Sequence, residues 1–229
     1  SYQNAHKGPC YVFILGSLQA RSPPAFCSVA RRLFPVRFPP SAFRLSPSSS
    51  TQMPAIDCLT YFGPWPYPVP DSGLEAIEKA LRQFGVTKAI VASSAAALGD
   101  DVSGNTALAE QIAGREFFGG YVVMNLMSLD ASLEVAQKLL ARNDFCAVLL
   151  YRGAHDPPLD SGACQLLVKS LLRFDKPVYV RIRNRHDLEG LYALARSFPS
   201  QKFVAGGIEA SAWAEACRGA RKQTNTLLD

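Results

Sequence analysis

Apolar and polar positions follow two alternating patterns along the chain from Met53 onward. Short apolar runs of strand length begin about every 25 to 33 residues, and segments with apolar residues at helical spacing lie between them. Leu74, Ile77, Leu81 and Phe84, for example, follow the i, i+3, i+7, i+10 spacing of one helix face. The strand-like runs cover residues 55–62, 88–93, 118–125, 146–151, 177–182 and 202–208.

Repeated strand–helix units predict parallel strands joined by right-handed crossovers. The strand runs are rich in Val, Ile and Leu on both faces, which is typical of strands covered by helices. Six units are visible, and residues 221–226 show no seventh strand. An eight-unit barrel would need roughly sixty more residues. The sequence therefore predicts a TIM-barrel-like β/α domain of about six units, incomplete at its C-terminal side. An open, doubly wound nucleotide-binding sheet is the alternative.

Residues 1–52 differ in composition from the rest of the chain. They contain nine Ser, seven Pro and six Lys or Arg, and no acidic residue. So many prolines disrupt both helical and strand periodicity. We expect an unstructured leader over 1–52 and a folded domain over 53–229. A mitochondrial transit peptide is the alternative for the leader.

Charge and cysteine usage narrow the functional classes. The chain has a net charge of +5, but without the leader the charge is −1, so a nucleic-acid partner is not expected. No apolar stretch approaches the roughly 18 residues of a membrane span. The six cysteines form no C-x-x-C pair, which favours reduced thiols and a cytoplasmic location.

A set of short motifs carries a resemblance to a known family. They are residues 56–66 (Ile-Asp, then Phe-Gly-x-Trp-Pro), 84–89 (Phe-Gly-Val-Thr-Lys-Ala), 104–105 with 122–125, 176–180 (Lys-Pro-Val-Tyr-Val), and 198–199 with 203–206. Their order over residues 53–216 resembles the amidohydrolase-related family of metal-dependent TIM-barrel hydrolases. The resemblance implies a hydrolase, or a related C–C lyase, that acts on a small carboxylated or cyclic substrate.

The positions where that family carries metal ligands are occupied here by other residues. Its strand-1 histidines fall on Leu59 and Tyr61, its strand-4 lysine near Leu149, and its strand-5 and strand-6 histidines on Arg181 and Gly207. Leu, Gly and Arg cannot coordinate a cation. We therefore predict no metal and no other cofactor, and a closer similarity to divergent branches that lack the histidines.

The strongest candidates for chemistry are two arginines on one predicted strand. Arg181 and Arg183 are two residues apart and so share a face, where they could clamp a carboxylate or phosphate. They could equally form a structural network with Asp57 and Glu209. For catalysis we expect Asp57 to orient the substrate or act as a base, and Tyr61 to add a polar contact. Trp65, Asn125, Tyr151 and Glu209 are the further predicted substrate-binding residues.

These residues also have simpler interpretations. Tyr61 and Tyr151 could be core tyrosines with one hydrogen bond each, and Trp65 could simply pack over the barrel mouth. His155 and His186 are expected at the surface. The leading hypothesis is therefore an amidohydrolase-like enzyme for a small-molecule substrate, which could assemble as a homo-oligomer. The alternative is a non-catalytic barrel that binds a small acid or a protein partner.

Overall fold

The computed structural model describes residues 55–69, 71–153 and 155–229, so the expected leader lies outside the described part. Seven parallel strands follow one another in sequence order in a single sheet. They are β1 (Ala55–Phe62), β2 (Val86–Ser93), β3 (Phe118–Met124), β4 (Phe145–Leu150), β5 (Val178–Arg181), β6 (Phe203–Gly206) and β7 (Thr226–Leu228). The helices are α1 (Leu74–Gln83), α2 (Ser94–Ala97), α3 (Asp101–Ile112), α4 (Leu129–Leu140), α5 (Gly162–Leu171), α6 (Arg185–Ser197) and α7 (Trp213–Lys222).

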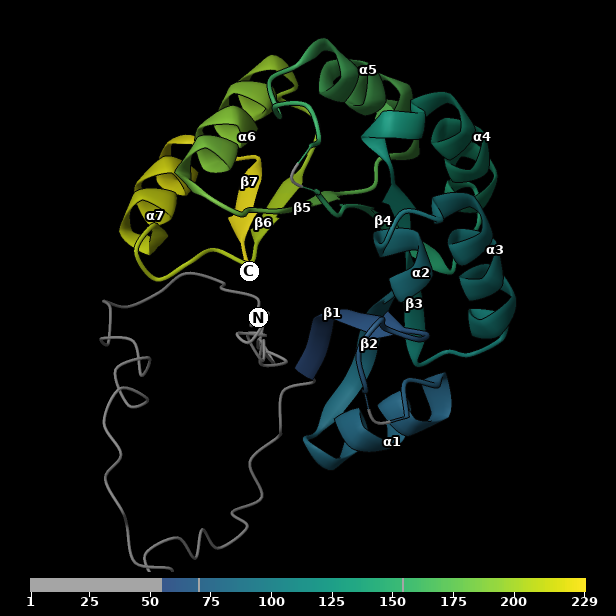
Figure 1. The fold of residues 1–229 in the computed structure, drawn as a ribbon. Coiled ribbons are helices and arrows are strands. Elements are labelled where there is room, and N and C mark those ends of the chain that lie inside the picture. Colours follow the sequence, from purple (N-terminus) through teal and green to yellow (C-terminus); the bar gives the residue numbers. More distant parts are fainter. Residues whose placement is uncertain (1–54, 70, 154) are drawn as a thin grey trace, which may run out of the picture.

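The sheet curls into an open half-barrel, with the long helices along its outer side (Figure 1). The TIM-barrel-like prediction is confirmed. The doubly wound alternative is wrong, because that arrangement needs a point where the strand order reverses and this sheet has none.

The six predicted β/α units are present, and a seventh strand that the sequence did not predict follows them. β7 pairs with β6 through Phe203 and Thr226, Val204 and Leu227, and Ala205 and Leu228. This strand has only three residues and follows a polar segment, so it lacks an apolar run of its own. The Asn225 side chain fixes its start by donating hydrogen bonds to the carbonyl oxygens of Ala195, Phe198 and Gln201.

Two apolar clusters divide the interior. The larger one fills the space between the sheet and the helices, and it includes Leu108, Phe145, Leu167, Leu191 and Phe203. The smaller one lines the inner, concave face of the sheet. Its members include Leu59, Tyr61, Ala92, Tyr121, Val123, Ala147, Leu149, Tyr151, Tyr179 and Val204. Because successive side chains point to opposite faces of a strand, alternate residues of each strand belong to the two clusters.

A buried asparagine holds α3 against the sheet. The register of β2 with β3 ends at Gly120, so the backbone of Val123 has no strand partner on that side. Asn105 supplies one: its Nδ2 donates to the Val123 carbonyl at 2.8 Å, and its Oδ1 accepts from the Val123 amide at 2.9 Å. The asparagine is fully buried.

Replacing Asn105 by alanine should lower the free energy of unfolding by about 2 kcal/mol, because two buried backbone groups lose their partners. Alanine has the higher helix propensity, so any loss reports the lost hydrogen bonds. Urea unfolding of the parent protein and of Asn105→Ala measures this loss of unfolding free energy. Thr106→Ala is the matched control, since Thr106 is exposed and its hydroxyl bonds only the Val102 carbonyl within α3. Equal stability of the two variants would contradict this role for Asn105.

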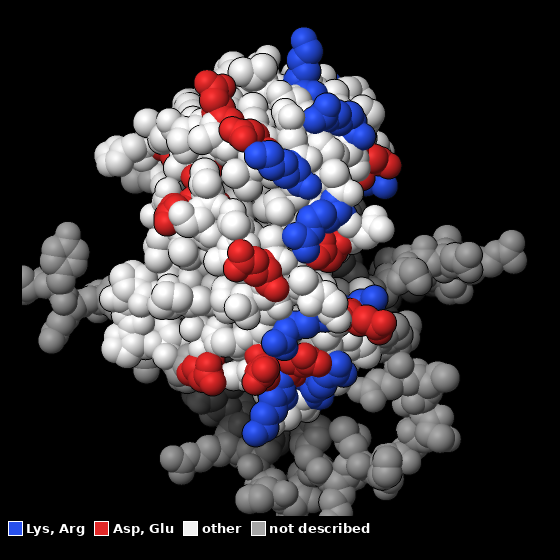
Figure 2. All heavy atoms as spheres, turned by 90° about the vertical axis from the view of Figure 1, so that its right-hand side faces the viewer, with Lys and Arg blue, Asp and Glu red and all other residues white. Residues whose placement is uncertain are grey.

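The helical face on the right of Figure 1 carries charges of both signs, interspersed with neutral residues (Figure 2). Ion pairs such as Lys138 with Glu134 on α4, at 2.8 Å, contribute to this mixture. A continuous basic surface of the kind that follows a phosphate backbone is not seen on this face. Within the described part of the chain, no helix combines the length and the apolar character that crossing a bilayer requires.

Candidate functional site

Arg181 lies at the carboxyl end of β5, the end where β/α barrels place their sites. Its Nη1 donates a hydrogen bond to the Tyr151 hydroxyl at 2.6 Å, and its guanidinium carbon lies 4.9 Å from the centre of the Tyr151 ring. The residue is exposed. Among the residues that the structure describes, no carboxylate forms an ion pair with it. The site therefore contains a solvent-accessible cation oriented by an aromatic ring.

Aromatic side chains from β1 and its following loop flank this arginine. Tyr61 meets Tyr151 edge-on with ring centres 6.0 Å apart, and Trp65 meets Tyr61 in the same way at 5.2 Å. Burial raises the pKa of Tyr61, Tyr151 adds to this rise, and Arg181 partly opposes it. Tyr61 is thus a neutral phenol at physiological pH and can donate a hydrogen bond, but it is not a base.

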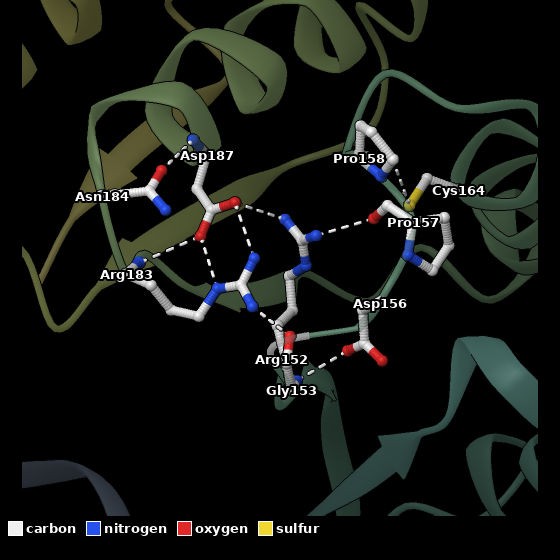
Figure 3. A network of polar contacts seen from close by, with 9 residues as sticks. All are labelled: Arg152, Gly153, Asp156, Pro157, Pro158, Cys164, Arg183, Asn184 and Asp187. Carbon is white, nitrogen blue, oxygen red and sulfur yellow. Dashed lines mark hydrogen bonds and ion pairs between the residues drawn. The ribbon is translucent and has the colours of Figure 1, made fainter.

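Arg183 belongs to a separate network with two residues that the sequence did not single out (Figure 3). Its Nε donates to Asp187 Oδ2 at 2.9 Å, and its Nη1 donates to the Gly153 carbonyl. Asp187 also accepts a hydrogen bond of 2.8 Å from Arg152 Nη1. The Arg152 and Asp187 side chains are 2% and 3% exposed, so one buried carboxylate is shared by two guanidinium groups.

Burial by itself raises the pKa of the Asp187 carboxyl, but the hydrogen bonds and charges of Arg183 and Arg152 outweigh it and hold the pKa below its usual range. The network corrects two expectations. Asp187, rather than Asp57 or Glu209, neutralises Arg183. Arg181 and Arg183 also do not share a face, because β5 ends at Arg181 and the strand alternation stops there.

Asp57 lies on β1 in register with Ala89 of β2, whose side chain belongs to the larger cluster between the sheet and the helices. Asp57 is 5% exposed, and its Oδ1 accepts a hydrogen bond from the Leu59 amide at 3.1 Å. Burial raises the pKa of its carboxyl, the Leu59 amide partly opposes this, and the charge of Asp229 adds to the rise. The same burial raises the pKa of the adjacent Cys58 thiol to about 11. Asp57 is thus a carboxyl that retains its proton more readily than usual.

Two further tyrosines, Tyr121 and Tyr179, lie on the inner face of the sheet. The Tyr121 hydroxyl donates to the Cys58 carbonyl at 2.7 Å, and the Tyr179 hydroxyl donates to Asp229 Oδ2 at 2.6 Å. Tyr179 passes directly over Gly206, where any β-carbon would collide with its phenol ring. The concave face is therefore lined by four tyrosines, with Tyr121 and Tyr179 in a lower layer and Tyr61 and Tyr151 in an upper layer beside Arg181.

Replacing Asp57 by asparagine should stabilise the protein at pH 7 by about 1 kcal/mol, because burial penalises the ionised carboxylate. The folded-state pKa lies above the unfolded value, so the parent protein gains stability as the pH falls through the folded pKa. The advantage of Asp57→Asn should therefore shrink toward pH 4. Thermal melting of both proteins across this range measures the difference. An advantage that is constant with pH, or a destabilised variant, would contradict the assignment.

The remaining predicted site residues lie away from Arg181 or at the surface. Asn125 starts the 3-10 turn Leu126–Ser128, where its Oδ1 accepts from the Met127 amide at 2.9 Å. Glu209 is exposed and lines a hollow of about 310 Å³ together with Arg183, Arg185 and Glu215. His155 and His186 are exposed. Out of the predicted set, the structure brings Tyr61, Trp65, Tyr151 and Arg181 together at one place, and Arg183 and Glu209 at another.

The residues on the inner face do not fit a divalent metal. Leu59, Tyr61 and Leu149 point into the concave cluster at the expected ligand positions, and Arg181 occupies the strand-5 position. On β6 the residue in register with the inner face is Gly206 rather than Gly207. Within the described ranges, no group of three or more His, Cys, Asp or Glu side chains could hold a metal ion.

Comparisons with known proteins show similarity at the level of the fold. Neither the protein-family models nor the curated proteins gave a match to the sequence. Among solved structures, a candidate amidohydrolase from Staphylococcus aureus matches with a TM-score of 0.53 and 13% identity, over 67% of both chains. An uncharacterized TIM-barrel protein from Bordetella bronchiseptica matches with a TM-score of 0.53 and 15% identity, over 69% of this chain and 59% of that one.

A third match has a ligand in its structure. It is 5-carboxyvanillate decarboxylase from Novosphingobium aromaticivorans, complexed with manganese and 4-hydroxy-3-methoxy-5-nitrobenzoic acid. It has a TM-score of 0.53 and 15% identity, over 66% of this chain and 54% of that one. The chain spans 54 to 67% of the length of the structures described here. The fold expected from the resemblance to amidohydrolase-related proteins is thereby confirmed.

Proposed function

We propose that this domain binds a small aromatic carboxylic acid, without a metal ion, at the upper layer formed by Tyr61, Tyr151 and Arg181. The observation that carries the proposal is Arg181: a guanidinium at the barrel mouth, oriented by Tyr151, that forms no ion pair with a described carboxylate. A guanidinium fork matches the two oxygens of a carboxylate. The nearby aromatic edges suit a planar ring.

The comparison with solved structures supports the chemical class. The decarboxylase from Novosphingobium aromaticivorans was solved with a substituted benzoic acid bound. That protein also contains manganese, whereas the inner face here has Leu59, Leu149 and Arg181 at positions where the family resemblance implies metal ligands. We therefore assign recognition of the acid to the arginine and the tyrosines, with no contribution from a metal.

Titration of the protein with benzoate in the presence of a chelator tests this function. Binding should be measurable by calorimetry, and its Kd should not change when the chelator is omitted. Benzamide, which has the same shape without the charge, should bind at least about tenfold more weakly, because hydrogen bonds to a charged group are worth more. Failure to bind benzoate, equal binding of benzamide, or binding only after manganese is added would each refute the proposal.

Turnover of the bound acid by hydrolysis or by a lyase reaction is the second candidate, and the observation in its favour is Asp57. A buried carboxyl with a raised pKa keeps its proton to higher pH than an exposed one and can serve as a proton donor. Product formation followed by NMR, with the parent protein and Asp57→Asn, tests this. Turnover that disappears in the variant while acid binding persists supports catalysis. Binding without turnover in either protein supports the non-catalytic alternative.

A further inference from the structure

The loop after β1 has an unusual sequence in which proline occupies alternate positions: Gly63-Pro64-Trp65-Pro66-Tyr67-Pro68-Val69. Proline fixes its own φ and biases the residue before it toward an extended conformation. Trp65 and Tyr67 are each flanked by prolines, so the backbone restricts both. The Gly63 amide donates to the Ser72 carbonyl at 3.1 Å, and the Ser94 hydroxyl donates to the Pro64 carbonyl at 2.8 Å. The loop is therefore stiff and anchored to the barrel.

This loop continues the aromatic contacts that begin at Arg181. The guanidinium lies over Tyr151, Tyr151 meets Tyr61, and Tyr61 meets Trp65. The Trp65 and Tyr67 rings are then stacked, with centres 5.6 Å apart and an angle of 21° between their planes. Each contact joins neighbours within the range of favourable aromatic pairs. An unbroken series of rings thus leads from the cation at the mouth to the outer end of the loop.

The outer end of this series is exposed. Tyr67 is 58% exposed and Val69, two residues later, is 43% exposed. A stiff loop that holds large apolar side chains in water at the rim of a concave site is typical of a ligand-binding surface. The preceding contacts link this surface to Arg181 through three intermediate rings.

We propose that Trp65 and Tyr67 form an outer subsite for a second planar ring of the ligand whose carboxylate binds Arg181. The inference rests on the proposed function and narrows its substrate class to acids with two aromatic rings. The inner ring lies beside Tyr61 and Tyr151, and the outer ring stacks on the Trp65–Tyr67 pair. Offset stacking on a preordered pair of rings adds affinity with little loss of conformational freedom.

Tryptophan fluorescence gives a direct readout. The chain contains two tryptophans, Trp65 and Trp213, so Trp213→Phe on α7 leaves Trp65 as the single reporter. In this background, benzoate, biphenyl-4-carboxylate and 4-benzyloxybenzoate are titrated separately. At least one of the two-ring acids should bind about tenfold more tightly than benzoate and change the Trp65 emission.

Variants of Tyr67 test whether the higher affinity for a two-ring acid comes from the outer subsite. Tyr67→Ala should reduce the advantage of the two-ring acid over benzoate to less than about threefold, whereas Tyr67→Phe should retain it. The matched control is Phe84→Ala, because Phe84 is an even more exposed aromatic residue, at 74%, that lies at the C-terminal end of α1. This control should leave all three affinities unchanged.

The outcomes separate this inference from the function on which it rests. If no acid binds, the proposed function fails and the subsite fails with it. If benzoate binds but neither two-ring acid binds more tightly, the outer subsite is refuted while the acid site stands. An advantage that survives in Tyr67→Ala would also refute it, because the second ring would then bind elsewhere.

Discussion

Replacing Asp187 by asparagine should lower the free energy of unfolding by about 3–5 kcal/mol, because one partner of a buried ion pair is removed and the other is left uncompensated. Arg152 would then lie buried at 2% exposure next to Arg183, with no carboxylate between the two guanidinium groups. Such a loss is a large part of the roughly 5–15 kcal/mol that stabilises a typical domain. Chemical unfolding monitored by circular dichroism measures it.

The same helix provides the matched control for this prediction. Glu189 lies two residues after Asp187 on α6 and pairs with Arg185 at 3.0 Å, but both side chains are more than half exposed. Glu189→Gln should therefore change stability by no more than about 0.5 kcal/mol. If the two variants lose comparable unfolding free energy, the buried network contributes no more to stability than the exposed ion pair.

The pH dependence of stability gives a second check on Asp187. Its folded pKa is depressed, so the stabilisation is present at pH values above the unfolded pKa and is lost as the pH falls through the folded pKa. The stability difference between the parent protein and Asp187→Asn should therefore be largest near neutral pH and vanish in strong acid. A difference that grows on acidification would contradict this.

Arg181→Gln should weaken benzoate binding at least about tenfold without unfolding the protein, because it removes the positive charge proposed to meet the carboxylate. The arginine is exposed and its hydrogen-bond partner is the Tyr151 hydroxyl, so its loss leaves no buried charge behind. Calorimetric titration gives the affinity, and a thermal melt confirms folding. Arg181→Lys should recover part of the benzoate affinity, since lysine restores the positive charge but not the planar guanidinium that can bind both carboxylate oxygens.

Arg185→Gln controls for the general effect of removing a positive charge from the same end of the barrel. Arg185 is 70% exposed and already pairs with Glu189 and Glu215. Its loss should leave the benzoate affinity within about twofold of the parent value, because solvent and salt screen exposed charges. If the two glutamine variants lose affinity equally, Arg181 is not the anchor.

The strand positions could be predicted because each main strand carries its own apolar run. β7 could not, since its three residues are held by pairing with β6 and by the Asn225 side chain rather than by local sequence. The alternation rule placed Arg181 correctly at the inner mouth. It misplaced Arg183, because the rule applies only within a strand and β5 ends two residues earlier.

The charge network was not visible in the sequence for a different reason. Asp187 lies in the first turn of α6, but its partner Arg152 is 35 residues away along the chain. Local periodicity gives no information on such a pairing. Asp57 shows the opposite case: the sequence suggested an arginine partner, and the structure gives it a backbone amide and a neighbouring carboxylate instead.

The contact of Tyr179 with Gly206 limits how the site can be re-engineered. The phenol occupies the space that a side chain on β6 would need and holds Asp229 through its hydroxyl. A histidine introduced at position 206 would have to displace that ring before it could reach the concavity. Installing a metal ligand at position 206 therefore requires at least two coordinated substitutions, and single-step mutational scanning would register the position only as intolerant.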